Sequence, residues 1–214
     1  LTEASPLLTV LNHQDHLVTD VKSERRLASC GKPVRGVDVR VVKEDGSDAK
    51  PGEVGEIIAR GPNIMLGYWK RPEDTEDVLR DGWLHTGDLA TVDDEGYIYL
   101  VDRKKDMIVT GGENVYSTEV EAVLYAHPAV KEAAVIPIPD PDWGEAVHAC
   151  VALRNGLQVT AAELEEFCRE RLANYKVPRS IEFIPDELPK GGTGKILKKQ
   201  LRERYWKDRA RRIS

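Results

Sequence analysis

A glycine-rich stretch near the carboxy terminus presents a single lysine. Residues 191–195 read Gly-Gly-Thr-Gly-Lys, and glycines allow such a loop to approach a ligand closely. The ammonium group of Lys195, a point charge on a flexible stem, suits a phosphate or a carboxylate. The stretch is not the phosphate loop of nucleoside triphosphatases, because Pro189 stands where that pattern needs glycine and Ile196 where it needs Ser or Thr. Taken alone, it reads as a surface loop with a solvated lysine.

A second candidate for chemistry is the carboxylate of Asp88. Thr86-Gly87-Asp88 follows the apolar pair Trp83-Leu84, which predicts a turn that exposes this carboxylate. A carboxylate so placed can accept hydrogen bonds from both hydroxyls of a ribose, as nucleotide sites often arrange. Gly-Asp by itself indicates only a turn, so the motif gains weight from its neighbours.

The elements that must position Asp88 are predicted to be strands. Apolar residues alternate or nearly so in 37–43 and 54–60, and the turn signal Glu44-Asp45-Gly46 lies between these runs. Residues 97–101 (YIYLV) follow a second turn signal of the same kind. Residues 1–102 are therefore expected to form a β-rich segment, either a small barrel or a distorted sheet.

From Arg103 onward the pattern changes to mixed helix and strand. Thr118 with Glu121, and Thr160 with Glu163, have the spacing of a capping box, which predicts a helix after each. The first helix must end before Pro128. Strands are predicted at 133–138, 147–153 and 180–184, and a third helix from Ile196 to about Arg209.

The expected fold class is thus α/β (α+β), with a β-rich region at 1–102 followed by a small α+β domain at 103–214. The charged run 102–106 (DRKKD) joins them, and a hinge is expected there, because a few exposed residues can absorb a rotation.

Composition excludes several classes of protein. Cys30, Cys150 and Cys168 form no CxxC pair, so neither a disulfide framework nor a zinc site is expected, and a reducing, cytoplasmic location is favoured. There is no apolar run of transmembrane length and no signal peptide at the start. Nothing in the net charge of −6 suggests nucleic-acid binding. Residues 195–212 carry a local charge of +7, which predicts a solvated helix face or weak contact with an anionic membrane surface.

Several motifs in order carry a resemblance that none of them carries singly. They are LTEASP (1–6), GEI (55–57), GYWKRP (67–72), HTGDL (85–89), DRKKD (102–106), GGEN (111–114), YKVP (175–178) and LPKGGTGKI (188–196). In order and spacing the chain resembles the adenylate-forming enzymes, the family of acyl- and aryl-CoA synthetases, peptide-synthetase adenylation domains and beetle luciferases. The resemblance covers essentially the whole chain. It implies that 1–102 is the end of the large AMP-binding domain and 103–214 its mobile C-terminal domain.

The resemblance also implies roles at the matching positions in acid activation by ATP. Thr2 would bind the nucleotide phosphate and Glu3 would hold Mg²⁺, a hard cation suited to oxygen ligands. Asp88, helped by Arg103, would bind the ribose hydroxyls of ATP and AMP. Lys195 would reach the reacting carboxylate and the α-phosphate.

For the second step the resemblance implies rotation about Lys105 and transfer of the acyl group to coenzyme A. Gly111, Gly112 and Glu113 would line the path of the pantetheine. Trp143 and the pair Tyr175-Lys176 would lie near the coenzyme A nucleotide, where an aromatic side chain is available for stacking.

Alternatives stay open at this point. The chain could be an adenylation domain that loads a carrier protein, although no carrier segment follows Arg212, or a non-catalytic chain with only nucleotide or coenzyme A contacts. Val109, where luciferases carry a lysine, departs from that branch. The acid could be fatty or aryl.

The chain opens with Leu1 in the middle of a motif, so we expect a fragment. Its partner would be the missing N-terminal part of its own chain, with the Ser/Thr/Gly-rich pyrophosphate loop and the acid pocket. Without that part the isolated fragment is expected to be inactive.

Overall fold

The computed structural model describes residues 1–207. The chain divides into two compact units, Leu1–Lys104 and Lys105–Ser214, each of which is described by itself below. The division falls between Lys104 and Lys105, whereas the sequence suggested a boundary after Asp102.

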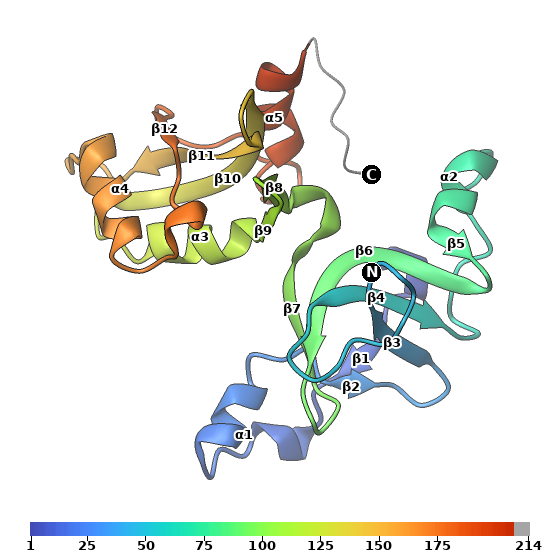
Figure 1. Ribbon diagram of the computed structural model, residues 1–214. Helices are drawn as coiled ribbons and strands as arrows, with labels where there is room; N and C mark the ends of the chain where they lie inside the picture. Colours follow the sequence, from blue (N-terminus) through green and yellow to red (C-terminus); the bar gives the residue numbers. More distant parts are fainter. Residues whose placement is uncertain (208–214) are drawn as a thin grey trace. The chain divides into compact units, whose positions relative to one another are not determined.

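Five antiparallel strands form the main sheet of the first unit (Figure 1). Their order is β3 (Asp38–Val42), β4 (Gly55–Arg60), β6 (Trp83–Val92) and β5 (Leu79–Arg80), and β7 (Ile98–Arg103) also pairs with β6. The strands predicted at 37–43, 54–60 and 97–101 are therefore confirmed. The core of this unit is the buried apolar cluster Val41, Ala49, Ile57, Ala90 and Ile98.

Short elements that the sequence analysis did not predict surround this sheet. They are the 3-10 helices η1 (Thr2–Ala4) and η2 (His13–His16), the helices α1 (Val21–Arg26) and α2 (Pro72–Val78), and the strand pair β1 (Thr9–Val10) with β2 (Lys32–Pro33). Local signals for both helices exist in the sequence. Asp20 caps α1 by accepting a hydrogen bond from the Ser23 amide at 2.7 Å, and Pro72 begins α2, where a missing N–H is harmless.

A second five-stranded sheet organises the other unit. Its order is β10 (Val130–Asp140), β11 (Gly144–Leu153), β8 (Ile108–Thr110) and β9 (Glu113–Val115), while β12 (Ser180–Phe183) pairs in parallel with β11. The strands predicted at 133–138, 147–153 and 180–184 are confirmed.

Helices cover both faces of this sheet, which explains the continuous apolar runs of β10 and β11. Ala133 and Val135 share one buried cluster with side chains of α3 (Ser117–Tyr125) and α4 (Ala161–Arg169). The intervening Ala134 and Ile136 face the opposite way and pack with Leu201 of α5 (Lys198–Trp206). The predicted α/β (α+β) class is confirmed.

The capping prediction holds for one helix and is wrong for the other. At α4 the Glu163 amide donates to Thr160 Oγ1 at 3.2 Å and the Thr160 amide donates back to Glu163 Oε2 at 2.8 Å, so the box is confirmed. The helix α3 instead begins at Ser117, with Tyr116 as its cap. The carboxylate of Glu121 is not available for capping because it accepts a hydrogen bond from the Val135 amide at 2.7 Å.

The third predicted helix is shorter at its start than expected. Ile196 pairs with Lys190 in an isolated β-bridge, so α5 begins only at Lys198. Its described part ends at Trp206, and the predicted end near Arg209 lies outside the described residues.

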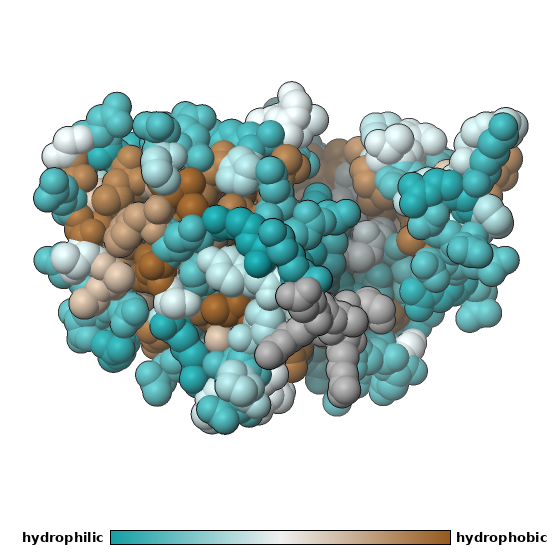
Figure 2. All heavy atoms as spheres, turned by 90° about the horizontal axis from the view of Figure 1, so that it is seen from above, coloured by the Kyte–Doolittle hydropathy of each residue, from teal (hydrophilic) through white to brown (hydrophobic). Residues whose placement is uncertain are grey.

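Hydrophilic and hydrophobic residues alternate on the face of the molecule drawn in Figure 2. Hydrophilic residues cover much of the surface visible in Figure 2, with hydrophobic residues in patches between them. None of the helices within 1–207 combines the length and the apolar character that a membrane crossing requires.

Much of the basic charge of α5 is already paired within the second unit. Lys198 contacts Glu121 at 2.7 Å, Arg202 contacts Asp106 at 3.3 Å, and Arg204 contacts Glu182 at 2.7 Å. Arg209, Arg211 and Arg212 lie outside the described residues. The membrane-surface contact suggested by the local charge stays a prediction.

Candidate functional site

Asp88 lies in a strand, not in the turn that its sequence suggested. Three residues of β6, Thr86 to Asp88, stand opposite the single residue Ile57 of β4, because the ladder shifts register between Glu56 and Ile58. Gly87 adopts φ +71°, a conformation that glycine accepts readily. The residues that suggested a turn thus form a bulge inside a long strand, and a bulge changes the direction of the side chains around it.

The carboxylate of Asp88 faces the guanidinium of Arg103. The two residues are direct partners across β6 and β7, and Asp88 Oδ1 lies 3.8 Å from Arg103 Nε. Asp88 also lines a cavity of about 220 Å³ in the first unit, together with Thr86, Leu100 and residues of the N-terminal segment. A carboxylate at a cavity wall, with a cation beside it, can accept hydrogen bonds from ligand hydroxyls.

The N-terminal residues Thr2 and Glu3 lie in η1, which is tied to the segment before α2. Tyr68 donates a hydrogen bond to Glu3 Oε1 at 2.9 Å, and the Met65 amide donates to the Glu3 carbonyl at 2.8 Å. Burial, followed by the hydrogen bond to Glu3, raises the pKa of Tyr68. Glu3 is half-buried and Thr2 is exposed, so both side chains can reach a ligand.

The residues around Glu3 fit a magnesium ion that is shared with a substrate. Mg²⁺ is usually bound through one or two carboxylates together with substrate phosphates and waters, not by a cage made only of protein. A single accessible carboxylate with a fixed orientation is what such an ion requires from the chain.

Sequence reasoning gave no role to Glu56, which organises the bulge. Its carboxylate is 14% exposed, accepts a hydrogen bond from the Gly87 amide at 3.1 Å and lies 3.3 Å from His85 Nδ1. Lys104 Nζ contacts the same carboxylate at 3.5 Å. The motif GEI contained this residue, but only the register of β4 against β6 reveals its partners.

The expected hinge residue, Lys105, directly follows Lys104 in the sequence. Its carbonyl accepts a hydrogen bond from Arg202 at 3.0 Å, and Arg202 also pairs with Asp106. Lys104 is held within the first unit and Lys105 within the second, so each unit fixes its own side of this junction. The hinge role of Lys105 stays a prediction.

Lys195 stands at the end of the glycine-rich loop, and its side chain is exposed. The stem of the loop is closed by hydrogen bonds from the Gly191 amide to the Lys195 carbonyl at 2.9 Å and from the Leu197 amide to the Pro189 carbonyl at 2.7 Å. A turn from Gly191 to Gly194 forms the tip, where Gly194 adopts φ +77°. Within residues 105–207, Lys195 has no carboxylate partner, so its ammonium group is available to an anion.

Gly111 and Gly112 form the two-residue turn of the hairpin between β8 and β9. Their φ angles of +59° and +88° are those of a type I′ turn, which favours glycine at both positions. The Gly111 amide donates to the Trp143 carbonyl at 3.0 Å. A Cβ atom on Gly111 would lie 2.3 Å from Trp143 Cε3, so the indole packs directly on this glycine.

Trp143 therefore joins the glycine turn to a neighbouring arginine. Its side chain is about half exposed, and the Arg179 guanidinium carbon lies 4.9 Å from the ring centroid. Sequence reasoning missed Arg179, although it directly follows the motif Tyr175 to Pro178. A flat, exposed aromatic ring beside a cation is suited to a nucleotide base and its phosphates.

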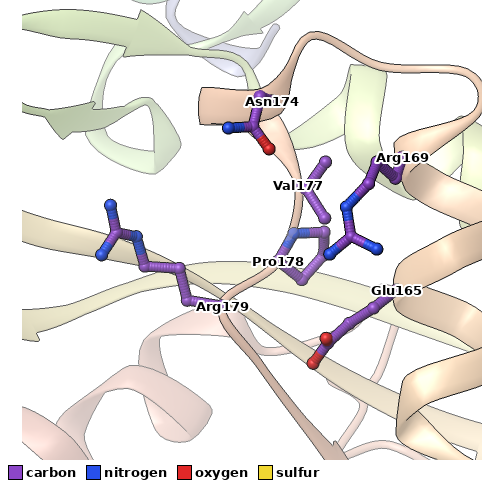
Figure 3. Close-up of a pocket in the computed structure, with 6 residues that line it drawn as sticks. All are labelled: Glu165, Arg169, Asn174, Val177, Pro178 and Arg179. Atoms are coloured by element: carbon purple, nitrogen blue, oxygen red, sulfur yellow. The ribbon is translucent and has the colours of Figure 1, made fainter.

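Arg179 also lines a cavity of about 350 Å³ beside α4 and the 3-10 helix η4 (Asn174–Lys176). In Figure 3, Glu165 and Arg169 extend from α4 toward Val177 and Pro178, whereas Arg179 points away from them. Arg179 thus belongs both to this cavity and to the Trp143 face.

The other expected coenzyme A residues are placed less favourably. Lys176 is paired with Glu119 at 2.7 Å, and although burial opposes it, this hydrogen bond raises the pKa of Lys176. Tyr175 is exposed and makes no ring contact with Trp143 within the described part of the chain. Glu113 is exposed at the start of β9.

Within residues 1–207, one cluster of two buried residues and a half-buried carboxylate has the residue types of a metal site. The ligand atoms of His148, Cys150 and Glu182 lie within 4.8 Å of one another. Arg204 contacts both oxygens of Glu182 at 3.1 and 2.7 Å, and Tyr205 donates to it at 2.9 Å. Burial raises the pKa of Cys150 to about 12, so the thiol stays protonated. The cluster fits a hydrogen-bond network between α5 and the sheet, because a cation would have to displace Arg204.

Family models match both units. Residues 1–69 match the model described as AMP-binding enzyme, and residues 119–195 match the AMP-binding enzyme C-terminal domain.

Curated relatives extend the similarity over nearly the whole chain. It is 49% identical over 205 residues to a feruloyl-CoA synthase from Amycolatopsis sp, which covers 96% of the chain and 40% of the relative. It is 48% identical over 203 residues to a long-chain-fatty-acid–CoA ligase from Yersinia pestis, which covers 95% of the chain and 34% of that relative. The chain thus spans about two fifths or less of the length of these relatives.

Solved structures of CoA synthetases are also similar to this chain. The o-succinylbenzoate CoA synthetase of Bacillus subtilis, in complex with its acyl-adenylate intermediate, superposes with a TM-score of 0.82 at 38% identity, over 100% of this chain and 41% of that one. A complex of the same Bacillus enzyme with ATP and a magnesium ion gives a TM-score of 0.80 at 39% identity, over 94% and 40% of the two chains.

Proposed function

Because the chain belongs to the AMP-binding enzymes, we propose that the whole protein activates a carboxylic acid with ATP and transfers the acyl group to coenzyme A. The observation that carries this proposal is the exposed ammonium group of Lys195, which has no carboxylate partner within residues 105–207 and ends a glycine-rich loop with a closed stem. The relatives reported above support it, since their names are those of CoA ligases.

In the first step, an oxygen of the acid attacks the α-phosphorus of ATP and pyrophosphate leaves with the electrons of the broken bond. Asp88 and Arg103 hold the ribose, and Thr2 binds a phosphate oxygen. Lys195 balances the negative charge that accumulates between the carboxylate and the phosphate, a contribution that is largest in the transition state. Glu3 would hold a magnesium ion, which would neutralise negative charge on the pyrophosphate.

In the second step, the thiolate of coenzyme A attacks the acyl carbonyl and AMP leaves. We propose that rotation about Lys105 withdraws Lys195 and presents the Gly111–Gly112 turn to the adenylate. Glycines leave room for the slender pantetheine, while Trp143 and Arg179 receive the nucleotide. Glu113 and Tyr175 would flank this path. Lys176 contributes by holding η4 through Glu119, not by offering a free charge.

Nothing in residues 1–207 distinguishes a fatty acid from an aryl acid, so both are retained. The names of the relatives include both classes. Coenzyme A is preferred to a carrier protein as the acyl acceptor because the relatives are named as CoA synthases and CoA ligases. Free, partly or fully buried cysteines agree with a reducing, cytoplasmic location.

The test is an acid-dependence assay on the full-length protein that contains this chain. Pyrophosphate release is measured with ATP, magnesium and a panel of fatty and aryl acids, and thioester formation is followed by mass spectrometry. We expect pyrophosphate to be released only in the presence of one class of acid, and a thioester to form only when coenzyme A is present. Acid-independent release of phosphate, or absence of any thioester, would remove the proposal.

A further inference from the structure

The carboxylate of Glu132, on a distant strand of the same unit, contacts the base of the glycine-rich loop that ends in Lys195. Glu132, on β10, accepts a hydrogen bond from the Leu188 amide at 2.9 Å through Oε2. Its other oxygen, Oε1, contacts Lys190 Nζ at 2.5 Å. The side chain is only 12% exposed, although glutamate is usually a surface residue. We propose that Glu132 is a positioning residue for the adenylation step, acting through this loop on Lys195.

Backbone hydrogen bonds connect the two strands of the stem, so a shift of one strand also moves the other. Lys190 lies opposite Ile196 in the β-bridge, and the Leu197 amide donates to the Pro189 carbonyl. The Gly191 amide donates to the carbonyl of Lys195 itself at 2.9 Å. Glu132 holds the first strand at Leu188 and Lys190, so the second strand, which ends the loop at Lys195, is held through these bonds.

Beyond the stem the chain has little else to fix it. Three of residues 191–195 are glycines, which have the greatest conformational freedom, and residues 192–195 are exposed. Leu188 is buried with Leu201 in the cluster between the sheet and α5, and Ile196 packs against the same cluster, so apolar contacts anchor both strands of the stem. Glu132, with a side chain only 12% exposed, adds a charged contact to this apolar anchor at Lys190, the residue next to the exposed tip.

The charge of Glu132 is secured by the same contacts. Burial favours the neutral acid, but the hydrogen bonds from Lys190 and from the Leu188 amide outweigh it and hold the pKa of Glu132 below its ordinary value. The carboxylate is therefore ionised at neutral pH. Lys190 is divided between Glu132 and the more exposed Glu187, at 3.1 Å.

The neighbouring residue supplies a matched control. Lys131 precedes Glu132 on the same strand and pairs with Glu187 at 2.8 Å, but both partners are substantially exposed. Exposed pairs of this kind contribute little to stability. Lys131→Gln changes one charge beside the loop and leaves both contacts of Glu132 in place.

The inference rests on the proposed function, and the experiment separates the two. In the full-length enzyme, Glu132→Gln keeps an oxygen for the Leu188 amide but loses the charge that holds Lys190. We expect kcat for adenylate formation to fall by about ten- to a hundredfold, the range that a misplacement of about 1 Å can cause. The KM values for ATP and acid, and the rate of thioester formation from supplied adenylate, should stay within about twofold. Glu132→Asp, which retains the charge, should recover part of the rate.

A second measurement needs no activity. Amide hydrogen exchange in the full-length protein should accelerate at Leu188, Gly191 and Leu197 in Glu132→Gln, with α4 unchanged, and should not accelerate in Lys131→Gln. Equal losses in both half-reactions with general acceleration of exchange would reduce Glu132 to a stability role and overturn the inference. Unchanged adenylation in Glu132→Gln, while Lys195→Ala abolishes it, would overturn the inference alone. If Lys195→Ala also leaves adenylation intact, the proposed function fails instead.

Discussion

Replacing Gly111 with alanine tests the contact between the glycine turn and Trp143. The added Cβ would lie 2.3 Å from Cε3 and 2.7 Å from Cζ3 of the indole, so the ring must move. Gly112→Ala is the matched control. Its φ of +88° imposes a comparable backbone penalty, but no atom lies within 4 Å of its added Cβ.

The magnitudes follow from these two terms. A non-glycine residue in a left-handed conformation costs about 1–2 kcal/mol, and both variants bear this cost. Overpacking typically adds about 1–3 kcal/mol, and Gly111→Ala should add about 1, at the low end, because the half-exposed indole can swing toward solvent. The displaced ring then no longer covers the glycine turn. Gly111→Ala should therefore impair thioester formation more than Gly112→Ala does, with adenylation unaffected.

Two assays follow this prediction. Urea unfolding of the 214-residue chain compares the loss of unfolding free energy in the two variants, both of which change only the second unit. Single-turnover transfer from supplied adenylate gives the rate of the coenzyme A step in the full-length enzyme. Equal losses of stability in the two alanine variants would show that Trp143 does not rest on Gly111, and the proposed coenzyme A face would lose its basis.

Two further predictions concern Asp88 and His148. Asp88→Asn should raise the KM for ATP by about tenfold, the effect of a weakened hydrogen bond to a charged group, whereas Asp38→Asn, which alters an exposed pair with Arg60 on the same sheet, should not; equal KM values would contradict the ribose role. Burial lowers the pKa of His148 below its ordinary 6.5, although Glu182 opposes this. In acid the unfolded state therefore binds a proton that the folded state does not, and the second unit should lose stability as the pH falls below about 6.5. His148→Asn should flatten this dependence in urea unfolding measured between pH 7 and 5.5, and an unchanged slope would refute the assignment.

The sequence predicted local structure correctly where the interacting residues are close along the chain. The capping box of Thr160 and Glu163 joins residues three apart, and it formed as predicted. The alternating runs of β3 and β4 likewise carry their own signal. At α3 the same pattern misled, because Glu121 is taken by the Val135 amide of a distant strand.

The parts that could not be predicted depend on register between strands far apart in sequence. Thr86 to Asp88 has the composition of a turn, and only the register shift between β4 and β6 at Ile57 shows a bulge within β6. Glu132 shows no motif at all, and its contacts with Leu188 and Lys190 span more than fifty residues. The exposed Lys195 was found by resemblance, whereas what holds its loop was visible only in the fold.

The role of Lys195 is tested by the rate of each half-reaction in Lys195→Ala of the full-length enzyme, with Lys199→Ala, an exposed lysine on the following helix, as the control. Adenylate formation should slow by a factor of about 10²–10³ in Lys195→Ala and should be unchanged in Lys199→Ala. Thioester formation from supplied adenylate should remain near the original rate. Adenylate formation that proceeds as fast without the Lys195 ammonium group would contradict the account.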